Sequence, residues 1–284
     1  MINDSELIIN ADGSIYHLNL KPEDIADTII FVGDPDRVPE VSKYFDRIEL
    51  RKGKREFITH TGYVKDKRIT VISTGIGTDN IDIVLNELDA LVNIDFQTRS
   101  LKPEIKSLDI IRIGTSGSIQ GNLAMGTILA SEYAIGFDSL MQYYKKTYST
   151  QESEIQQAVL QTFDDLSFKP YIGHASPELL KKFAFDLPMG ITMTAPGFYG
   201  PQGRQLRTQN VYPNLIRQAN AFQVNNRQIT NLEMETAGIY ALSNLLGHHA
   251  LSINAILASR VKETFAENPQ EIVDKAIQMV LSRL

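Results

Sequence analysis

Short apolar segments that end in glycine-containing loops recur along this chain, and they constrain its fold more than any other feature. Thr28–Val32 runs into Gly33-Asp34-Pro35, and Asp109–Ile113 runs into a loop expected at 114–118. Each pair predicts a buried strand followed by a turn. A third strand is expected at Leu251–Leu257. In an α/β sheet, ligands bind beyond the carboxyl ends of the strands, so we expect the site at these loops.

Segments with helical spacing lie between the strands. Apolar residues from Ile81 to Val92 follow a helical period, with Asp79 as the expected N-cap. Asn268 and Pro269 are typical of the start of a last helix. Other helices are expected at 151–163, 177–185 and 235–246, and other strands at 127–131, at 190–194 and in a hairpin over 56–72. The alternation predicts a three-layer α/β fold, and because no Pro- or Ser-rich linker interrupts it, we expect one domain over residues 1–284.

The composition excludes several classes of protein and site. The chain has 284 residues and a net charge of -6, which disfavours nucleic acid or an anionic membrane as its main partner. It has no cysteine, so disulfides, thiolate nucleophiles and cysteine-based metal sites are excluded. Residues 1–20 lack the pattern of a signal peptide, and no apolar run reaches membrane-spanning length. We therefore expect a cytoplasmic protein, in which an anionic ligand would need a local cationic pocket.

Three arginines near the expected loops could form such a pocket. Arg37 closely follows Gly33, Arg55 precedes the expected hairpin, and Arg112 lies inside an apolar strand. A buried guanidinium needs a partner, because an unpaired buried charge is very costly. One interpretation of Arg112 is a structural ion pair. The other is an anion held by Arg112, the hydroxyl of Thr115 and backbone amides, because the planar guanidinium can bond two phosphate oxygens at once.

Residues 198–204 form the most distinctive short motif. The segment Phe-Tyr-Gly-Pro-Gln-Gly-Arg places Gln202 and Arg204 two residues apart. An amide offers a donor and an acceptor, and a guanidinium offers a fork of donors. Together they can bond the edge of a flat polar heterocycle, while a nearby ring such as Phe198 stacks on its face. The alternative is an ordinary turn with a solvated arginine.

Acidic residues and histidines supply further candidates. Glu233-Met234-Glu235 precedes an expected helix. Carboxylates there are favoured by the helix dipole; alternatively, one of them accepts hydrogen bonds from a vicinal diol such as that of ribose. The five histidines show no metal-ligand spacing, so we expect no metal site. His17 is compatible with a plain surface or edge position, and His248 and His249 are expected to end a helix after Gly247.

Seven motifs, spread in order over nearly the whole chain, carry a family resemblance. They are Tyr16-His17-Leu18, Gly33 to Val38, Arg55-Glu56-Phe57, Ser73 to Gly77, Arg112 to Gly117, Phe198 to Arg204 and Glu233 to Ala237. Each is weak alone, but together they are specific. The chain resembles the trimeric-and-hexameric nucleoside phosphorylase superfamily, and within it the uridine phosphorylases.

This resemblance implies a fold, an activity and an assembly. The expected fold is α/β/α in three layers, with a central mixed, twisted sheet. The expected activity is the reversible phosphorolysis of uridine to uracil and ribose 1-phosphate in pyrimidine nucleoside salvage. Inorganic phosphate is the co-substrate and no cofactor is implied. The family also implies a homo-oligomer with active sites shared between subunits, typically a hexamer built as a trimer of dimers.

The resemblance also implies roles for individual residues. Phosphate would be bound by Gly33, Arg37, Arg112 and Thr115, completed by Arg55 of a neighbouring subunit. Ribose would be held by Glu235 and Met234, and by His17 of the neighbour. Uracil would be bound by Gln202 and Arg204, with Phe198 beside it and Arg260 ordering the pocket. The catalytic set would be Arg37, Arg112, Arg204, Gln202 and Glu235.

Departures from the family pattern bear on the substrate. Purine-cleaving relatives typically place an Asp after a Ser behind the last core strand, whereas Arg260 follows Ser259 here. Residues 198–204, called the base loop from here on, have Gly200-Pro201 where relatives have Pro-Gly. This difference leaves thymidine and deoxyuridine open as additional substrates. Asp79-Asn80 replaces small residues near a position where some relatives bind a monovalent cation, so we do not expect that ion.

Four other functions are alternatives to uridine phosphorolysis. They are a purine nucleoside phosphorylase, a pyrimidine nucleoside phosphorylase of broader specificity, a nucleosidase that uses water, and a non-enzymatic nucleoside-binding module. Ser259-Arg260 disfavours the purine enzyme. A nucleosidase or a binding module would not need phosphate-binding arginines, yet Arg37, Arg55 and Arg112 are all present.

Overall fold

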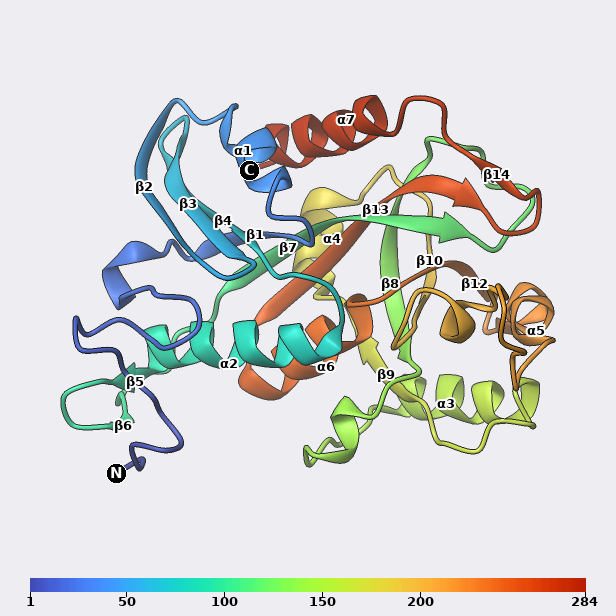
Figure 1. The fold of residues 1–284 in the computed structure, drawn as a ribbon, viewed down its shortest axis with the longest axis horizontal. Coiled ribbons are helices and arrows are strands. Elements are labelled where there is room, and N and C mark those ends of the chain that lie inside the picture. Colours follow the sequence, from blue (N-terminus) through green and yellow to red (C-terminus); the bar gives the residue numbers. More distant parts are fainter.

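A twelve-stranded mixed sheet runs through the molecule (Figure 1). The computed structural model describes residues 1–284. The strands of this sheet are β1 (Thr28–Val32), β2 (Arg47–Lys54), β3 (Phe57–Val64), β4 (Lys67–Ser73), β7 (Asp109–Ser118), β8 (Ile128–Gly136), β9 (Tyr171–His174), β10 (Met189–Thr194), β11 (Gln223–Val224), β12 (Arg227–Glu233), β13 (His249–Ser259) and β14 (Thr264–Phe265). The pair β5 (Ile94–Asp95) and β6 (Ser100–Leu101) forms a separate small sheet.

The pairing of the central strands explains where a site can form. β1 lies parallel between β4 and β7, and β7 is parallel to β13. β13 pairs antiparallel with β8, which is parallel to β10; β10 is parallel to β12, and β12 returns antiparallel to the end of β7. The strands β7, β13, β8, β10 and β12 therefore close into a ring. Because β1, β7, β12 and β13 end near one another, their carboxyl ends can surround a common cavity.

Helices cover both faces of this sheet. They are α1 (Arg37–Ser42), α2 (Thr78–Asn93), α3 (Thr150–Thr162), α4 (Pro177–Phe183), α5 (Leu215–Ala221), α6 (Thr236–Leu246) and α7 (Pro269–Ser282), with short 3-10 turns at Pro22–Asp24, Leu140–Gln142 and Gly200–Gln202. Figure 1 shows α1 and α7 on one side of the central strands and α2 and α6 on the other. The predicted three-layer α/β/α fold with a mixed sheet is confirmed.

Two clusters of buried apolar residues hold the layers together. The larger has 47 residues and includes every residue of β1 except Thr28, together with the inward face of α2. The smaller has 15 residues and lies among β8, β10, β12, α3 and α5. Burial of this apolar surface is the main driving force for the fold. The one-domain organisation stays a prediction.

Three local predictions were wrong. β7 continues through residues 114–118, where a loop was expected, because β13 pairs along its whole length and β12 pairs with Gly117 and Ser118. α2 begins at Thr78 after Gly77, which has a φ of 95°, so Asp79 lies in the first turn and is not the N-cap. α6 ends at Leu246, and Gly247, with a φ of 78°, turns the chain so that His249 begins β13.

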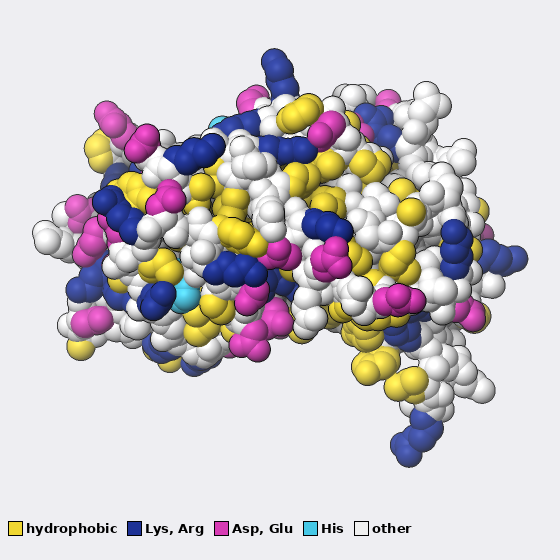
Figure 2. Space-filling view, turned by 90° about the horizontal axis from the view of Figure 1, so that it is seen from above, with side chains coloured by type: hydrophobic (Ala, Val, Ile, Leu, Met, Phe, Trp, Pro, Cys, Tyr) yellow, Lys and Arg dark blue, Asp and Glu magenta, His cyan; other side chains and the backbone are white.

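The surface shows no single basic region on the face drawn in Figure 2, where Lys and Arg side chains are interspersed with Asp and Glu. None of the helices combines the length and hydropathy needed to span a bilayer. No group of three or more His, Asp and Glu side chains is arranged to hold a metal ion.

Candidate active site

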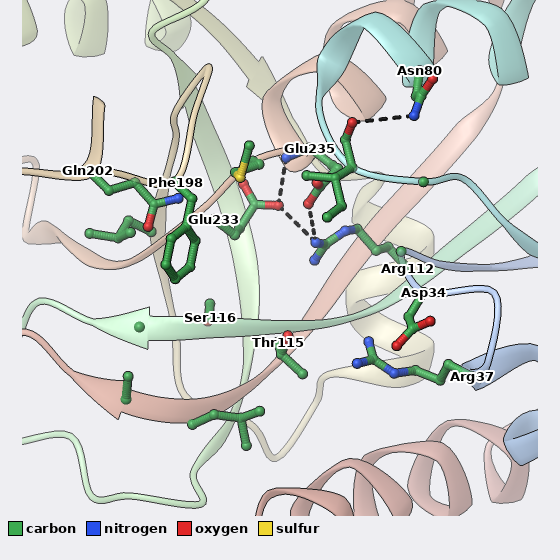
Figure 3. A pocket seen from close by; sticks show the side chains of 18 of the residues that line it. Asp34, Arg37, Asn80, Arg112, Thr115, Ser116, Phe198, Gln202, Glu233 and Glu235 are labelled. Carbon is green, nitrogen blue, oxygen red and sulfur yellow. Dashed lines mark hydrogen bonds and ion pairs between the residues drawn. The ribbon is translucent and has the colours of Figure 1, made fainter. Parts of the chain in front are cut away.

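A cavity of about 1010 Å³ opens at the carboxyl ends of β1, β7, β12 and β13 (Figure 3). Most of the candidate residues line it: Gly33, Arg37, Arg112, Thr115, Phe198, Gln202, Arg204, Met234 and Glu235. In Figure 3, Asp34 and Arg37 lie at one end of the cavity, and Phe198 and Gln202 lie at the other. Residues distant in sequence are thus brought together in the expected combination of cationic, carboxylate and aromatic groups.

Arg112 lies at the centre of this arrangement and is only 5% exposed. Its Nη2 donates to Oε2 of Glu235 at 2.5 Å and lies 3.2 Å from Oε2 of Glu233. Burial lowers the pKa of Arg112, but the charges of Glu233 and Glu235 outweigh it, so that the pKa is raised overall and the guanidinium stays charged. The two interpretations of Arg112 are therefore compatible, because the same side chain is ion-paired and lines the cavity.

The two glutamates before α6 have different surroundings. Glu233 accepts hydrogen bonds through Oε2 from the backbone N–H groups of Glu235 and Thr236 and from the Thr236 hydroxyl, and through Oε1 from the Thr194 hydroxyl at 2.6 Å. It therefore caps the start of α6, as the helix-dipole interpretation expects. Glu235 accepts only from the Gly77 N–H at 2.9 Å and from Arg112. Burial raises the pKa of Glu235 against the opposing effect of Arg112, and Glu233 adds to the rise.

Arg37 gives the cavity a second cationic group. It is the first residue of α1 and follows the Gly33 loop, which leads out of β1. Burial lowers the pKa of Arg37, and the nearby positive charge of Arg112 lowers it further. A bound anion would offset the repulsion that Arg37 experiences from Arg112, so this end of the cavity suits an anion. Thr115 lines the same cavity from β7.

The loop 198–204 folds as a turn, but its arginine is not simply solvated. Arg204 donates through Nη1 to Oε1 of Gln202 at 2.5 Å and to the carbonyl of Phe198 at 2.7 Å, and its Cζ lies 3.7 Å from the Phe198 ring centroid. Gly203, with a φ of 67°, permits the turn that brings the Gln202 and Arg204 side chains together. Gln202 is 2% exposed. Burial and the charge of Arg260 lower the pKa of Arg204 to about 10.

Three candidate residues do not line the cavity of their own chain. Arg55 is exposed in the β2–β3 turn, with a φ of 57°. His17 is half-buried, and its Nδ1 lies 2.7 Å from Oε1 of Glu87, whose carboxylate also accepts from two backbone N–H groups, those of His17 and Leu18. Arg260 packs beside Gly117, where a Cβ would lie 3.5 Å from its Cγ. Arg260 is also close enough to Arg204 for its charge to lower the pKa of Arg204.

The structure also places residues at the cavity that were not singled out from the sequence. They include Asp34, Glu56, Ser116, Leu257 and Phe265. Asn80, considered from the sequence only for a cation position, lines the cavity as well. Asp34, Glu56 and Ser116 lie inside motifs that carried the resemblance, so the motifs themselves were a usable signal. Phe265 is 66% exposed on the short strand β14, and nothing in its local sequence points to a cavity.

Comparisons with known proteins agree with this geometry. The sequence model of the Phosphorylase superfamily matches residues 27–284. A uridine phosphorylase of Thermococcus kodakarensis is 29% identical over 258 residues, which covers 90% of this chain and 81% of that protein. A purine nucleoside phosphorylase of the DeoD type from Oceanobacillus iheyensis is 26% identical over 279 residues, covering 94% and 98%.

A solved structure is similar over almost its entire length. It is a nucleoside phosphorylase of Trypanosoma brucei, whose crystal structure is described as showing uridine phosphorylase activity. The two proteins are 31% identical and superpose with a TM-score of 0.88, covering 98% of this chain and 99% of the other. With the family match extending from residue 27 to the last residue, this chain belongs to the phosphorylase superfamily.

Proposed function

We propose that this protein catalyses the reversible phosphorolysis of uridine to uracil and ribose 1-phosphate, a reaction of pyrimidine nucleoside salvage. One observation carries the proposal. A single cavity joins two arginines, Arg37 and Arg112, to a buried carboxylate, Glu235, and to the amide–guanidinium pair of Gln202 and Arg204. These groups are suited to a phosphate, a ribose diol and a uracil edge, in that order along the cavity. The uridine phosphorylases among the relatives support the same activity.

The charges suit the chemistry of glycosidic cleavage. Breaking the bond builds positive charge on the ribose and negative charge on the base. Phosphate held by Arg37, Arg112 and Thr115 would stabilise the ribose cation and attack its anomeric carbon. Gln202 and Arg204 would stabilise the departing uracil anion. Each preorganised donor of this kind is worth about 3–4 kcal/mol of transition-state stabilisation. The reaction needs no covalent nucleophile, metal or cofactor, and inorganic phosphate is a co-substrate.

The ribose would be held between these two ends. Glu235 lies next to Arg112 and is 5% exposed, so its carboxylate can accept hydrogen bonds from the 2′- and 3′-hydroxyl groups in a largely dry site. Met234 lines the same wall and would pack against the sugar. A carboxylate that binds a diol beside an anion-binding arginine places the anomeric carbon between phosphate and base.

The positions of Arg55 and His17 support a site shared between subunits. Neither residue lines the cavity of its own chain. Arg55 from a neighbouring subunit would complete the phosphate site, and His17 would bond the ribose 5′-hydroxyl. The proposal therefore includes a homo-oligomer, with a hexamer built as a trimer of dimers, working in the cytoplasm.

A purine nucleoside phosphorylase is the second candidate, because one relative carries that name at 26% identity. Protonation of a purine N7 needs an acid at the base end of the cavity. The group that borders the base loop here is the guanidinium of Arg260, and its charge acts on Arg204. A guanidinium is a poor proton donor, so this end is better suited to a uracil. A broader range that includes deoxyuridine or thymidine remains part of the same proposal.

A substrate panel tests the function directly. Uridine, deoxyuridine, thymidine, inosine and adenosine are each incubated with the enzyme, with and without inorganic phosphate. We expect uracil release from uridine only when phosphate is present, together with ribose 1-phosphate. Uracil release that persists unchanged without phosphate would identify a nucleosidase instead. Preferential cleavage of inosine or adenosine would identify the purine enzyme, and no cleavage of any nucleoside would favour a binding module.

A further inference from the structure

Arg112 has a buried neutral partner on the side away from its two carboxylates. Its Nη1 donates to Oδ1 of Asn254 at 3.0 Å. Asn254 lies on β13, next to Gly114 of β7 in the parallel register, and is fully buried. Gly114 makes this contact possible, because a Cβ there would lie 1.6 Å from Nη1 of Arg112 and 2.9 Å from Oδ1 of Asn254. The guanidinium is therefore held from two sides.

The orientation of the Asn254 amide is determined by its other contacts. Its Nδ2 donates to the hydroxyl oxygens of Ser131 and Ser252, each at 3.1 Å. If the amide were reversed, its NH₂ group would face the N–H groups of Arg112, and two donors would oppose each other in a dry interior. The Oδ1 atom of Asn254 is therefore fixed toward Arg112.

One branch of this network continues to the cavity wall. Ser131 is hydrogen-bonded to Thr192 at 2.5 Å, Thr192 donates to Oδ1 of Asn231 at 2.9 Å, and Nδ2 of Asn231 donates to the Ser116 hydroxyl at 2.9 Å. Since Ser131 already accepts from Asn254, and Thr192 uses its hydrogen toward Asn231, the Ser131 hydroxyl donates to Thr192. All donors point away from Arg112, and a reversal of Asn254 would disturb the whole branch.

The second branch leads back to the carboxylates. Ser252 is hydrogen-bonded to Thr236 at 2.9 Å, and Thr236 donates to Oε2 of Glu233 at 2.8 Å. The same Glu233 oxygen lies 3.2 Å from Arg112. Arg112, Asn254 and Glu233 are thus joined in a closed, buried hydrogen-bond network. This network leaves the guanidinium little freedom to rotate.

We propose that Asn254 is a positioning residue for phosphate binding. Its Oδ1 accepts a hydrogen bond from Nη1 of Arg112, which opposes the electrostatic attraction of the guanidinium to Glu233 and Glu235. With Nη1 held by Asn254, the guanidinium cannot turn both of its terminal nitrogens onto the two carboxylates, and N–H groups remain available for phosphate oxygens. Asn254 itself touches no ligand. This inference rests on the proposed role of Arg112 in phosphate binding.

The test compares two buried asparagines. Asn254→Leu removes the acceptor at nearly constant size. Asn93→Leu is the matched control, because Asn93 is 1% exposed and its side chain makes its own hydrogen bonds, but it lies at the end of α2 and does not line the cavity. Inorganic phosphate is titrated into each free protein by calorimetry, and KM values for phosphate and uridine are measured.

For Asn254→Leu we expect about tenfold weaker phosphate binding and a similar rise in the phosphate KM, because a hydrogen bond to a charged group is lost. We expect less than about threefold change in the uridine KM.

A second variant keeps the test decisive if Asn254→Leu does not fold. Ser131→Ala deletes one oxygen that anchors the Asn254 amide and leaves Arg112 untouched. It should weaken phosphate binding in the same direction, by a smaller factor. Wild-type phosphate affinity in a folded Asn254→Leu or Ser131→Ala protein would overturn the inference, as would equal losses in Asn254→Leu and Asn93→Leu. If the wild-type protein binds phosphate but does not cleave uridine, only the proposed function fails.

Discussion

Arg112 and Glu235 are bonded directly to each other, with Nη2 of the arginine 2.5 Å from Oε2 of the glutamate. These are the groups proposed to hold phosphate and ribose. Each is therefore the other's direct partner, and both residues are only 5% exposed. Because the two groups are direct partners, phosphate bound at Arg112 would change the electrostatic surroundings of Glu235, and we expect the two proposed sites to be electrostatically linked.

Replacing Glu235 should separate the proposed ribose binding by Glu235 from the proposed phosphate binding by Arg112. Glu235→Gln keeps the size of the side chain but removes a negative charge beside Arg112. We expect uridine phosphorolysis to fall by at least about 100-fold, because a charge-assisted contact to the ribose is lost. Phosphate should bind the free variant several-fold more tightly, since one repelling carboxylate is gone. Calorimetric titration with phosphate checks this point, and weaker phosphate binding than in the wild type would contradict it.

The base loop offers a second prediction. Gln202→Ala and Arg204→Ala should each lower kcat/KM for uridine by about 100- to 1000-fold, because each removes a donor from the departing base. Arg207→Ala is the matched control, since Arg207 is exposed in the segment that follows this loop and does not line the cavity. Steady-state kinetics and circular dichroism measure activity and fold. Near-normal activity in both active-site variants would show that the base binds elsewhere.

The shared site can be tested by complementation. Arg55→Ala and Arg112→Ala chains should each be almost inactive alone. Mixed under conditions that exchange subunits, they should regain part of the activity, because some hybrid sites then carry both arginines. A chain with both substitutions, mixed with either single variant, should restore none. Absence of rescue after mass spectrometry has verified exchange would argue against a contribution from the neighbouring subunit.

A buried cluster away from the cavity sets the response to acid. Glu152 is 1% exposed and is hydrogen-bonded to Lys146, His174 and the Ser149 N–H. Burial raises its pKa, but these contacts outweigh burial and lower the pKa from 4.5 to about 2. A carboxylate whose folded pKa lies below its unfolded pKa stabilises the protein at higher pH. This contribution should be complete above pH 4.5 and should vanish as the pH falls through about 2.

The Glu152→Gln variant tests whether this carboxylate stabilises the protein at higher pH. At neutral pH the variant should lose about 3 kcal/mol of unfolding free energy, because Lys146 is left buried without its counter-charge. Urea unfolding at a series of pH values gives the difference between the two proteins. The difference should shrink as the pH falls below 4.5. A difference that stays constant down to the acid transition would refute the assignment to Glu152.

Strands with continuous apolar runs could be predicted from the sequence, whereas polar strands could not. β1 has the predicted bounds, because all five of its residues are buried. β12 carries Thr230, Asn231 and Glu233 in its buried part and was not predicted. These polar side chains are tolerated because other strands satisfy them: Thr192 and Ser116 bond Asn231, Thr194 bonds Glu233, and the carbonyl of Ile191 accepts from the Thr230 hydroxyl. β2 was also missed, because its alternating exposure and many charges lack a buried apolar face.

The sequence by itself determined the alternation of strands and helices, the order of the family motifs and nine of the residues that line the cavity. Only the tertiary structure decided how the polar groups are paired: that Glu233 caps α6, that Glu235 meets Arg112, and that Asn254 holds Arg112 from behind. The physical reason is the separation along the chain between the residues that interact. Hydrophobic periodicity is a local property that a short window reveals. The partners of Arg112 lie 123 and 142 residues away along the chain, and only the register of the closed sheet brings them within hydrogen-bonding distance.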